Sequence, residues 1–395
     1  MLRVLKFGGS SVATTTKIKE IAENLKTFKE MGDKLVVVVS AMGKTTNNLI
    51  ALSNEITKKP NKSEMDNLMS TGEMVTTALL AIALDKLGIK AISLTGAKAG
   101  IVTTDDFGKA FISYINPSKI VEYLNQDYVV VVAGFQGITT DGFTTTLGRG
   151  GSDTTAVALA GALGGVCEIY TDVDGVYTVD PRIYPTAKKL SSITFDEMME
   201  LSLNGAKVLE TRSVELAKKY GVQLYLGKTN EIGKNGTMVK ETINDFEKMK
   251  VSGLSVKENI SHISITLKQG SVYEFVEAIS KIVDKMEGFV VNTVNDLAVI
   301  SFAIIDDKVN DLVLKLYDDL SSYKFKISAK QNLTKLTLVG NGLSTHKYFV
   351  KQAIAILNKN NIEIDFVTLN EISMSIYLEK DVEKAVQILS KEFDL

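Results

Sequence analysis

The apolar residues of the first 240 or so positions fall into short runs separated by longer segments of helical spacing. Apolar spacing predicts helices over about 15–30 and 72–88, and helical material broken near Pro60. Strands that are apolar on both faces and separated by helices are typical of an open, mostly parallel sheet between helix layers, so we expect an α/β fold. The strands are predicted at 3–7, 34–41, 90–96, 128–135 and 166–173.

After about residue 245 the pattern becomes an internal repeat. An offset of 73 residues relates Ile263 to Leu336 and Asn292 to Asp365. Each copy reads strand, helix, strand, strand and a further helix, which is the pattern of a compact βαββαβ (ferredoxin-like) unit. Two copies are too few for a solenoid. We interpret them as a paired regulatory module, with a purely structural dimerisation module as the alternative.

These patterns predict three domains, in keeping with a chain of 395 residues. The α/β domain is expected over 1–245. The first repeat is expected over 260–328 and the second over 329–395, with the strand 250–258 as a candidate addition to the second.

Composition narrows the classes of function. The formal charge of −2 gives no reason to expect a nucleic-acid groove or a polybasic membrane face. Because Cys167 is the only cysteine and His262 and His346 the only histidines, neither a disulfide framework, a zinc site nor histidine catalysis is expected. The longest aliphatic runs, 35–39 and 128–133, are far shorter than the ~20 residues that span a bilayer. With no apolar signal core at the N-terminus, we expect a cytoplasmic protein without membrane contact.

The segment from Lys6 to Ser11 follows the first predicted strand. Gly8 and Gly9 let the backbone approach an anion closely, and successive N–H groups can form a nest for phosphate oxygens. Ser10 or Ser11 can cap the next helix, whose positive end adds to the attraction. Lys6 precedes the glycines, so the loop does not fit G-x-x-x-x-G-K-[ST]. A plain turn with an exposed lysine is the alternative.

A second glycine-rich loop lies within 145–165. Three glycines surround Arg149 at the entrance of an apolar helix, which suits capture of a carboxylate or phosphate. Asp153 is placed to be a helix cap, and the alternative is that it orients Lys6 or a metal.

A third loop, 170–182, follows a predicted strand. Tyr177 offers a flat face to a nucleotide and Arg182 can reach phosphate, although an acidic turn at Asp174–Gly175 explains the pattern as well. Glu73 and Lys207 have no role that spacing alone can assign.

Together these stretches resemble the aspartate kinases of the amino-acid kinase superfamily. "KFGGSSVA", "STGEMV", "GFQG", "LGRGGSDTTA", "YTDVDGVYTVDPR" and "GAKVLETRS" occur in the family's order, and the tail resembles the family's two ACT domains. The resemblance implies an amino-acid-kinase-type sheet followed by two ACT domains. It implies that ATP and L-aspartate give 4-phospho-L-aspartate and ADP, with Mg²⁺, as the entry to lysine, threonine and methionine biosynthesis. A homodimer or higher homo-oligomer through the ACT domains is also implied.

The resemblance further implies roles for individual residues. Lys6 and Asp153 are implied to be catalytic, Lys6 by contacting the transferred phosphoryl group and Asp153 by organising Lys6. Ser40 or Thr45 are alternatives to one aspartate contact, Thr46. No protein ligand of Mg²⁺ is implied, because phosphates and water hold this ion in most such sites. The implied ATP contacts are Lys6, Gly8, Gly9, Ser10, Thr171, Asp172, Tyr177, Arg182, Lys207 and Val208. The implied aspartate contacts are Thr46, Glu73, Phe135, Arg149 and Ser152.

An end-product amino acid, lysine first and threonine second, is the effector that the resemblance implies. The tail departs from the family's pattern, since Asn292 stands where an acid is often found and the small G-V-A triplet after Gly342 is missing. The effector therefore stays open. The implied effector contacts are Gln269, Gly270, Ser271, Val272, Asn292, Asn295 and Asp296.

The chemistry of this reaction agrees with the residues. The β-carboxylate of aspartate has a reference pKa of about 3.9 and is ionised at neutral pH, so it needs no general base. Phosphoryl transfer instead needs cations and alignment, which Lys6, the glycine amides and Mg²⁺ can supply. A related kinase for glutamate, acetylglutamate, a nucleotide or carbamate is the first rival, and a non-catalytic amino-acid sensor the second. Arg149 and the two-copy tail speak against the first, and the intact set of Lys6, Arg149 and Asp153 against the second.

Overall fold

The computed structural model of the chain divides into two units. The first comprises residues 1–177, 189–202 and 208–242, and the second 178–188, 203–206 and the described residues from 251 to 395. Lys207, Gly342 and His346 lie outside the described residues. The structure describes residues 1–206, 208–242, 251–283, 285–341, 343 and 347–395.

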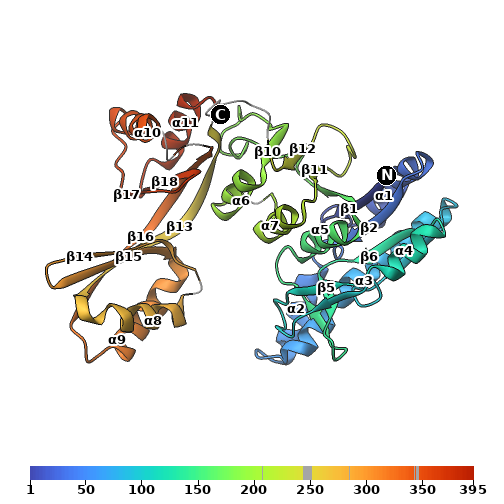
Figure 1. The fold of residues 1–395 in the computed structure, drawn as a ribbon, viewed down its shortest axis with the longest axis horizontal. Helices are drawn as coiled ribbons and strands as arrows, with labels where there is room; N and C mark the ends of the chain where they lie inside the picture. Colours follow the sequence, from blue (N-terminus) through green and yellow to red (C-terminus); the bar gives the residue numbers. More distant parts are fainter. Residues whose placement is uncertain (207, 243–250, 284, 342, 344–346) are drawn as a thin grey trace. The chain divides into compact units, whose positions relative to one another are not determined.

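An eight-stranded sheet forms the middle of the first unit (Figure 1). The described strand pairings in this sheet are parallel, except that β11 (Leu224–Lys228) pairs antiparallel with β12 (Thr237–Lys240). The strand order is β10 (Ser192–Thr194), β12, β11, β9 (Val166–Thr171), β1 (Leu2–Phe7), β2 (Lys34–Val39), β6 (Val129–Ala133) and β3 (Ala91–Leu94).

Helices cover both faces of this sheet. The apolar sides of α1 (Thr15–Glu30) and α3 (Lys62–Lys86) pack on the face that carries Leu5 and Phe7. Successive side chains of a strand point to opposite faces, so Lys6 projects to the other face, where α5 (Gly151–Leu163) packs on β1, β2 and β9. The predicted α/β arrangement is confirmed. The remaining helices of this unit are α2 (Thr45–Ile56), α4 (Ser118–Asn125), α6 (Phe195–Leu203) and α7 (Thr211–Tyr220).

α3 begins ten residues earlier than the predicted helix, at Lys62, because Asn61 caps it by accepting from the N–H groups of Ser63 and Glu64. Among the described helices, only α3 is long and apolar enough to cross a membrane by length and composition. Its Leu80 and Leu84 are fully buried in the core of the unit.

A small four-stranded sheet was not predicted. Its strands are three or four residues long, too short for an alternating pattern to stand out. β8 leads directly into the Arg149 loop, so this sheet supports one of the candidate stretches. The strand order is β5 (Ile112–Ile115), β4 (Ile101–Thr103), β7 (Gln136–Ile138) and β8 (Thr144–Thr146).

The second unit is built on a six-stranded antiparallel sheet. The strand order is β14 (Glu287–Val294), β15 (Leu297–Ile305), β13 (Val251–Lys268), β16 (Phe325–Gly340), β18 (Ser373–Leu378) and β17 (Phe366–Leu369). The helices are η1 (Gln269–Ser271), α8 (Val272–Ile282), η2 (Asp306–Lys308), α9 (Val309–Asp319), α10 (Lys347–Lys359) and α11 (Val382–Glu392).

β13 and β16 are long strands that serve both repeats. Residues 251–257 of β13 pair with the end of β16, and residues 260–267 pair with its beginning. The register shifts between these halves, where Asn259 and Asn332 adopt left-handed backbone conformations with φ of 59° and 60°. Asparagine tolerates this conformation better than most residues. Since 332 − 259 = 73, the repeat extends to this pair of bends.

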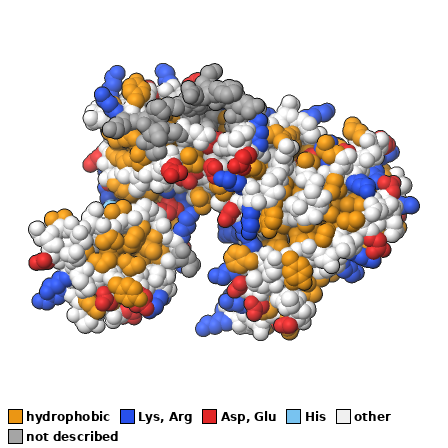
Figure 2. Space-filling model, viewed as in Figure 1, with side chains coloured by type: hydrophobic (Ala, Val, Ile, Leu, Met, Phe, Trp, Pro, Cys, Tyr) orange, Lys and Arg blue, Asp and Glu red, His pale blue; other side chains and the backbone are white. Residues whose placement is uncertain are grey.

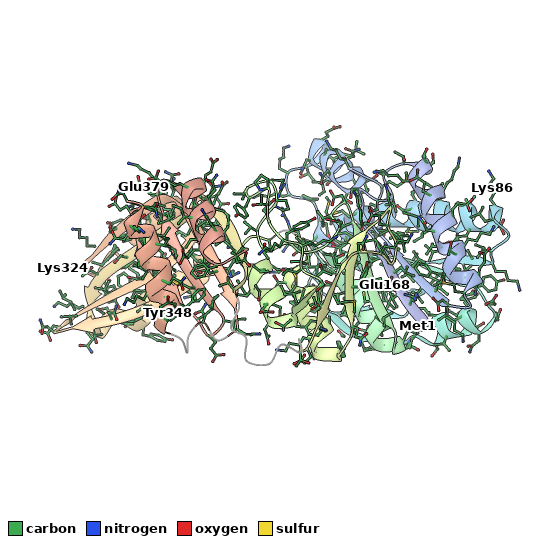
Figure 3. The ribbon with its side chains drawn as sticks, turned by 90° about the horizontal axis from the view of Figure 1, so that it is seen from above. Met1, Lys86, Glu168, Lys324, Tyr348 and Glu379 are labelled. Carbon is green, nitrogen blue, oxygen red and sulfur yellow. The ribbon has the colours of Figure 1, made fainter. Side chains whose placement is uncertain are left out.

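Exposed apolar side chains gather on the first repeat. In Figure 2 they lie over the part that carries α8 and α9, where Tyr273 is 75% exposed and Leu314 65%. At the amino edge of the first unit's sheet, polar groups pair instead: Arg3 binds both Asp33 and Glu168, and Figure 3 labels Glu168 near Met1.

Candidate active site

The loops that follow β1, β2, β6 and β9 meet at the carboxyl edge of the first unit's sheet. Gly8 donates its N–H to Tyr170 O, and Gly43 donates to Gly9 O at 3.0 Å. A Cβ on Gly9 would lie 2.9 Å from the carbonyl oxygen of Ala41, closer than real contacts allow. Open α/β sheets bind ligands at this edge, so the tight approach of these loops builds a site floor.

Lys6 forms a buried ion pair with Asp153. Its Nζ lies 2.6 Å from Oδ1 of Asp153, and both residues are 8% exposed. The N-cap of α5 is Gly150, without a side-chain cap, so the expectation that Asp153 caps the helix is wrong. The ion pair supports the alternative interpretation, in which Asp153 orients Lys6. The reading of Lys6 as an exposed lysine is also wrong.

Glu73 is a buried carboxylate with one oxygen in use. Oε1 accepts the N–H of Ala41 at 3.1 Å, and Oε2 has no hydrogen-bond partner among the described residues. Burial raises the pKa of Glu73 from its ordinary 4.5 to about 7. A buried, unpaired oxygen of this kind suits a cationic ligand.

Short contacts join Glu73 to the Lys6 ion pair. Ser40, which precedes Ala41, donates its hydroxyl to Ser152 Oγ at 3.0 Å, and Ser152 precedes Asp153. The predicted residues Glu73, Ser152, Asp153 and Lys6 are therefore brought together. Thr46 is half-buried in the first turn of α2, whereas the hydroxyl of Thr45 donates to Met42 O at 2.7 Å.

Arg149 lies in a glycine-flanked loop beside this cluster of residues. Gly148 and Gly150 have φ of 76° and 64°, and among the described residues the exposed Arg149 side chain has no partner. Phe135 also has a positive φ, 69°, and a Cβ on Gly151 would lie 2.8 Å from its ring. The loop thus leaves a free cation next to the start of α5.

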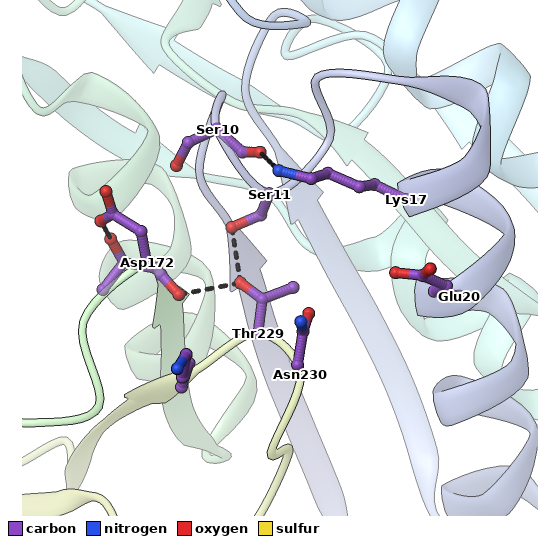
Figure 4. Close-up of a pocket in the computed structure, with 9 residues that line it drawn as sticks. Ser10, Ser11, Lys17, Glu20, Asp172, Thr229 and Asn230 are labelled. Atoms are coloured by element: carbon purple, nitrogen blue, oxygen red, sulfur yellow. Dashed lines mark hydrogen bonds between the residues drawn. The ribbon is translucent and has the colours of Figure 1, made fainter.

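A pocket of about 150 Å³ opens between the loops after β1, β9 and β11 (Figure 4). Ser11 Oγ lies 2.6 Å from Thr229 Oγ1, which donates to Thr171 O at 3.0 Å. These three residues line the pocket, and Figure 4 labels Ser11 and Thr229. All lining residues are polar: Ser10, Ser11, Lys17, Glu20, Thr171, Asp172, Lys228, Thr229 and Asn230.

Sequence reasoning missed part of this pocket. Lys228 ends β11 and Thr229 follows it, so the rule that sites follow parallel strands could have found them, but no glycine loop marks the position. The expected cap at Ser10 or Ser11 is wrong, since Thr14 caps α1 by accepting from Lys17 N.

The other predicted ATP contacts among the described residues do not line this pocket. Tyr177 is half-buried and its hydroxyl donates to Asp174 at 3.1 Å, and Val208 is half-buried. Arg182 belongs to the second unit, where it pairs with Asp180 at 2.6 Å. Lys207 lies outside the described residues.

The candidate effector residues lie at two neighbouring turns of the second unit. Gln269 in η1 donates its N–H to the carbonyl oxygen of Asp296 at 3.0 Å. Asn295, with φ of 55°, and Asp296 form the β14–β15 turn, and Asn292 is exposed on β14. Gly270, Ser271 and Val272 continue from Gln269 into α8.

Within the described ranges, no group of three or more His, Cys, Asp or Glu side chains could hold a metal ion. The pocket wall does carry the carboxylates of Asp172 and Glu20. A cation bound there would need further oxygen ligands from its partner molecule or from water.

Comparisons with known proteins agree on one family. The sequence model of the amino acid kinase family matches residues 1–228, and that of an ACT domain matches 336–393. An aspartokinase of Bacillus sp. (strain MGA3) is 39% identical over 401 residues, covering 100% of this chain and 97% of that protein.

Two solved structures of E. coli aspartokinase III share the fold. The complex with aspartate and ADP (R-state) has a TM-score of 0.82 at 23% identity, and each chain is fully covered. The complex with lysine and aspartate (T-state) has a TM-score of 0.75 at 23% identity, with 99% of each chain covered.

Proposed function

Since this chain belongs to the amino acid kinase family, as one of its aspartokinases, we propose that it transfers the γ-phosphoryl group of ATP to the β-carboxylate of L-aspartate. The products are 4-phospho-L-aspartate and ADP. The observation that carries the proposal is the link from Glu73, with its unpaired buried oxygen, through Ser40 and Ser152 to the Lys6–Asp153 ion pair.

On the amino-acid side, Glu73 binds the α-ammonium of aspartate and Arg149 binds its α-carboxylate. The unpaired Oε2 of Glu73 supports the first contact, and the free guanidinium supports the second. Together they select an α-amino acid and leave the β-carboxylate free to point at Lys6. Ser152, Phe135 and Thr46 line the same substrate.

On the nucleotide side, the polar pocket between the loops after β1, β9 and β11 takes ATP. Gly8, Gly9 and Ser10 wrap the phosphates. Ser10 lines this pocket together with Thr171 and Asp172. ADP bound to the E. coli protein of the same fold supports nucleotide use. Tyr177, Val208, Lys207 and Arg182 remain predicted contacts.

The transfer itself needs no general base. The β-carboxylate is already ionised at neutral pH, and the barrier is the approach of one anion to another. Lys6 offers its charge where the phosphoryl group passes, and Asp153 holds the ammonium in place. Mg²⁺ would neutralise charge on the phosphates, and they and water would supply most of its ligands. The carboxylates of Asp172 and Glu20 on the pocket wall are the protein groups that could complete them.

Allosteric control acts through the ACT part of the chain. We propose lysine as the effector and threonine as the alternative, bound at the η1 turn and the β14–β15 turn. The Gln269–Asp296 hydrogen bond, which joins the two turns, supports this position, as does lysine bound to the E. coli protein. An effector of this kind shifts the population toward a less active state.

The entry step of lysine, threonine and methionine biosynthesis, a homodimer or higher homo-oligomer, and a cytoplasmic location remain predictions that accompany this function.

A hydroxamate assay for acyl phosphate tests the reaction. The purified chain is given ATP, Mg²⁺ and either aspartate, glutamate or no acceptor, and signal is expected with aspartate alone. Signal with glutamate, or none with either, would contradict the proposal.

Adding lysine or threonine at millimolar concentration tests the effector: inhibition is expected, and unchanged activity with both would refute regulation by these two.

A further inference from the structure

Asp66 is a fully buried carboxylate in α3 to which the proposed reaction gives no role. Its Oδ2 accepts the N–H groups of Thr146 and Gly108, both at 2.8 Å, and its Oδ1 accepts the Thr146 hydroxyl at 2.7 Å. No lysine or arginine of the described chain pairs with it. A buried carboxylate without a cation is unfavourable unless its oxygens are well hydrogen-bonded, so these donors account for its retention.

Arg212, near the start of α7, reaches the same region from the other side. Its Nη1 donates to Leu147 O at 2.9 Å and its Nη2 to Ala110 O at 3.0 Å. The guanidinium carbon lies 4.7 Å from the ring centroid of Phe111. One planar side chain therefore bridges two backbone segments, which a lysine cannot imitate.

The contacts converge on Thr146 and Leu147. Thr146 O accepts from Ala110 N and Leu147 N donates to Phe135 O, both at 2.9 Å. With the bonds from Asp66 and Arg212, every backbone N–H and C=O of this dipeptide has a partner. Arg149 follows two residues after Leu147 on glycine-flanked backbone. The base of the Arg149 loop is therefore held by hydrogen bonds, whereas the Arg149 side chain has no partner among the described residues.

We propose that Asp66 and Arg212 are positioning residues that hold the base of the Arg149 loop so that its guanidinium meets the substrate's α-carboxylate. The inference rests on the proposed function, which gives Arg149 that carboxylate. Bidentate binding has narrow geometry, and a displacement of about 1 Å can cost on the order of 100-fold. The effect falls on aspartate and not on ATP, because other loops form the nucleotide pocket.

A double-mutant cycle tests this role. Asp66→Ala and Arg212→Met are each expected to raise KM for aspartate by about 10- to 100-fold while changing KM for ATP by less than about twofold. Asp66→Asn keeps an acceptor for the two N–H groups and is expected to restore most of the affinity. In an Arg149→Ala background neither change should raise KM for aspartate further, since both act through Arg149.

Asp33→Ala is the matched control, a buried carboxylate removed from the opposite edge of the sheet, and it should leave both KM values unchanged. If Asp66→Ala does not fold, Arg212→Met carries the same cycle. Equal rises in both KM values, no rise, or a further rise in the Arg149→Ala background would overturn the positioning role while aspartate phosphorylation stands. If the wild-type chain phosphorylates no aspartate, the proposed function fails and the positioning role falls with it.

Discussion

The Nζ of Lys6 lies 2.6 Å from Oδ1 of Asp153, and both side chains are largely shielded from water. This ion pair at the carboxyl edge of the sheet contributes to both stability and ligand binding. It stabilises two charges that would be costly to bury alone, and it holds a cation ready for a charged ligand.

These two contributions can be separated. Lys6→Met is expected to lower kcat by about 100-fold or more, because a cation at the transferred group is lost. It also leaves Asp153 buried without its partner, which costs about 3 kcal/mol of stability. The double change Lys6→Met with Asp153→Asn should recover thermal stability but no activity. Near-normal kcat in the single variant would refute the mechanism.

Glu73 predicts how aspartate binding depends on pH. Its pKa of about 7 means that the free protein holds a neutral carboxyl below that pH. Because the ammonium of aspartate needs the carboxylate, kcat/KM for aspartate should fall about tenfold per pH unit below 7. Glu73→Gln should raise KM and remove this dependence. A wild-type profile that stays flat from pH 5.5 to 8 would contradict the assignment.

The same group links pH to stability. Its folded pKa of about 7 lies above the ordinary 4.5, so the folded chain binds the proton more tightly than the unfolded chain. Its contribution to stability is therefore greatest below pH 4.5 and is lost as the pH rises to about 7. Thermal unfolding without aspartate should show this loss in the wild type and not in Glu73→Gln. Bound aspartate should offset it.

Gly9→Ala tests the close approach of the loop after β1, which we assign to ATP, to the loop after β2, which holds Glu73. The new Cβ would lie 2.9 Å from Ala41 O, so the loops after β1 and β2 must separate. Since Ala41 also holds Glu73, kcat/KM should fall for both substrates, measured by varying each in turn. A loss confined to ATP would show that the loops act independently.

A buried charge cluster in the second unit predicts a further stability effect. Lys335, 6% exposed, binds Glu287 at 2.7 Å and Asn204 at 2.5 Å. Burial acts to raise the pKa of Glu287, but its ion pairs with Lys335 and Lys257 outweigh burial and lower it. Lys335→Met should therefore cost about 3 kcal/mol of unfolding free energy.

The pH dependence of this cluster has the opposite sign to that of Glu73. With its pKa lowered, Glu287 contributes stability above pH 4.5 that is lost as the pH falls through the lowered value. Lys335→Met should flatten that acid limb of the denaturation profile. Lys330→Met, which removes the half-exposed partner of Asp365 and Glu379, is the matched control and should cost at most about 1 kcal/mol. Equal losses in both variants would argue against a special role for burial.

The sheet of the first unit was predictable because its central strands are uninterrupted apolar runs. Val36 to Val39 and Val129 to Val132 are buried on both faces, and few other structures accommodate such runs. The site could be predicted where glycines and charged residues follow these strands, as at Lys6 and Arg149. Their assembly around Glu73 is what the structure adds to the pattern.

Other parts of the fold and of the site could not be predicted, because no local sequence pattern marks them. Asp66 looks like an ordinary polar residue of a helix start, and only its burial against Thr146 distinguishes it. Thr229 meets Ser11 across 218 residues, a pairing that no short pattern encodes. The β4–β5–β7–β8 sheet was missed since propensity over three residues is weak beside tertiary contacts.

The sharing of β13 between the two repeats bears on how the chain acquires its fold during synthesis. Residues 251–257 pair with 335–340, so the whole first repeat is an insertion within the second. As the chain leaves the ribosome, the first repeat can close while residues 251–257 still await their partner. The second repeat can close only when the last strands have emerged, and until then an apolar strand edge stays open to wrong pairing.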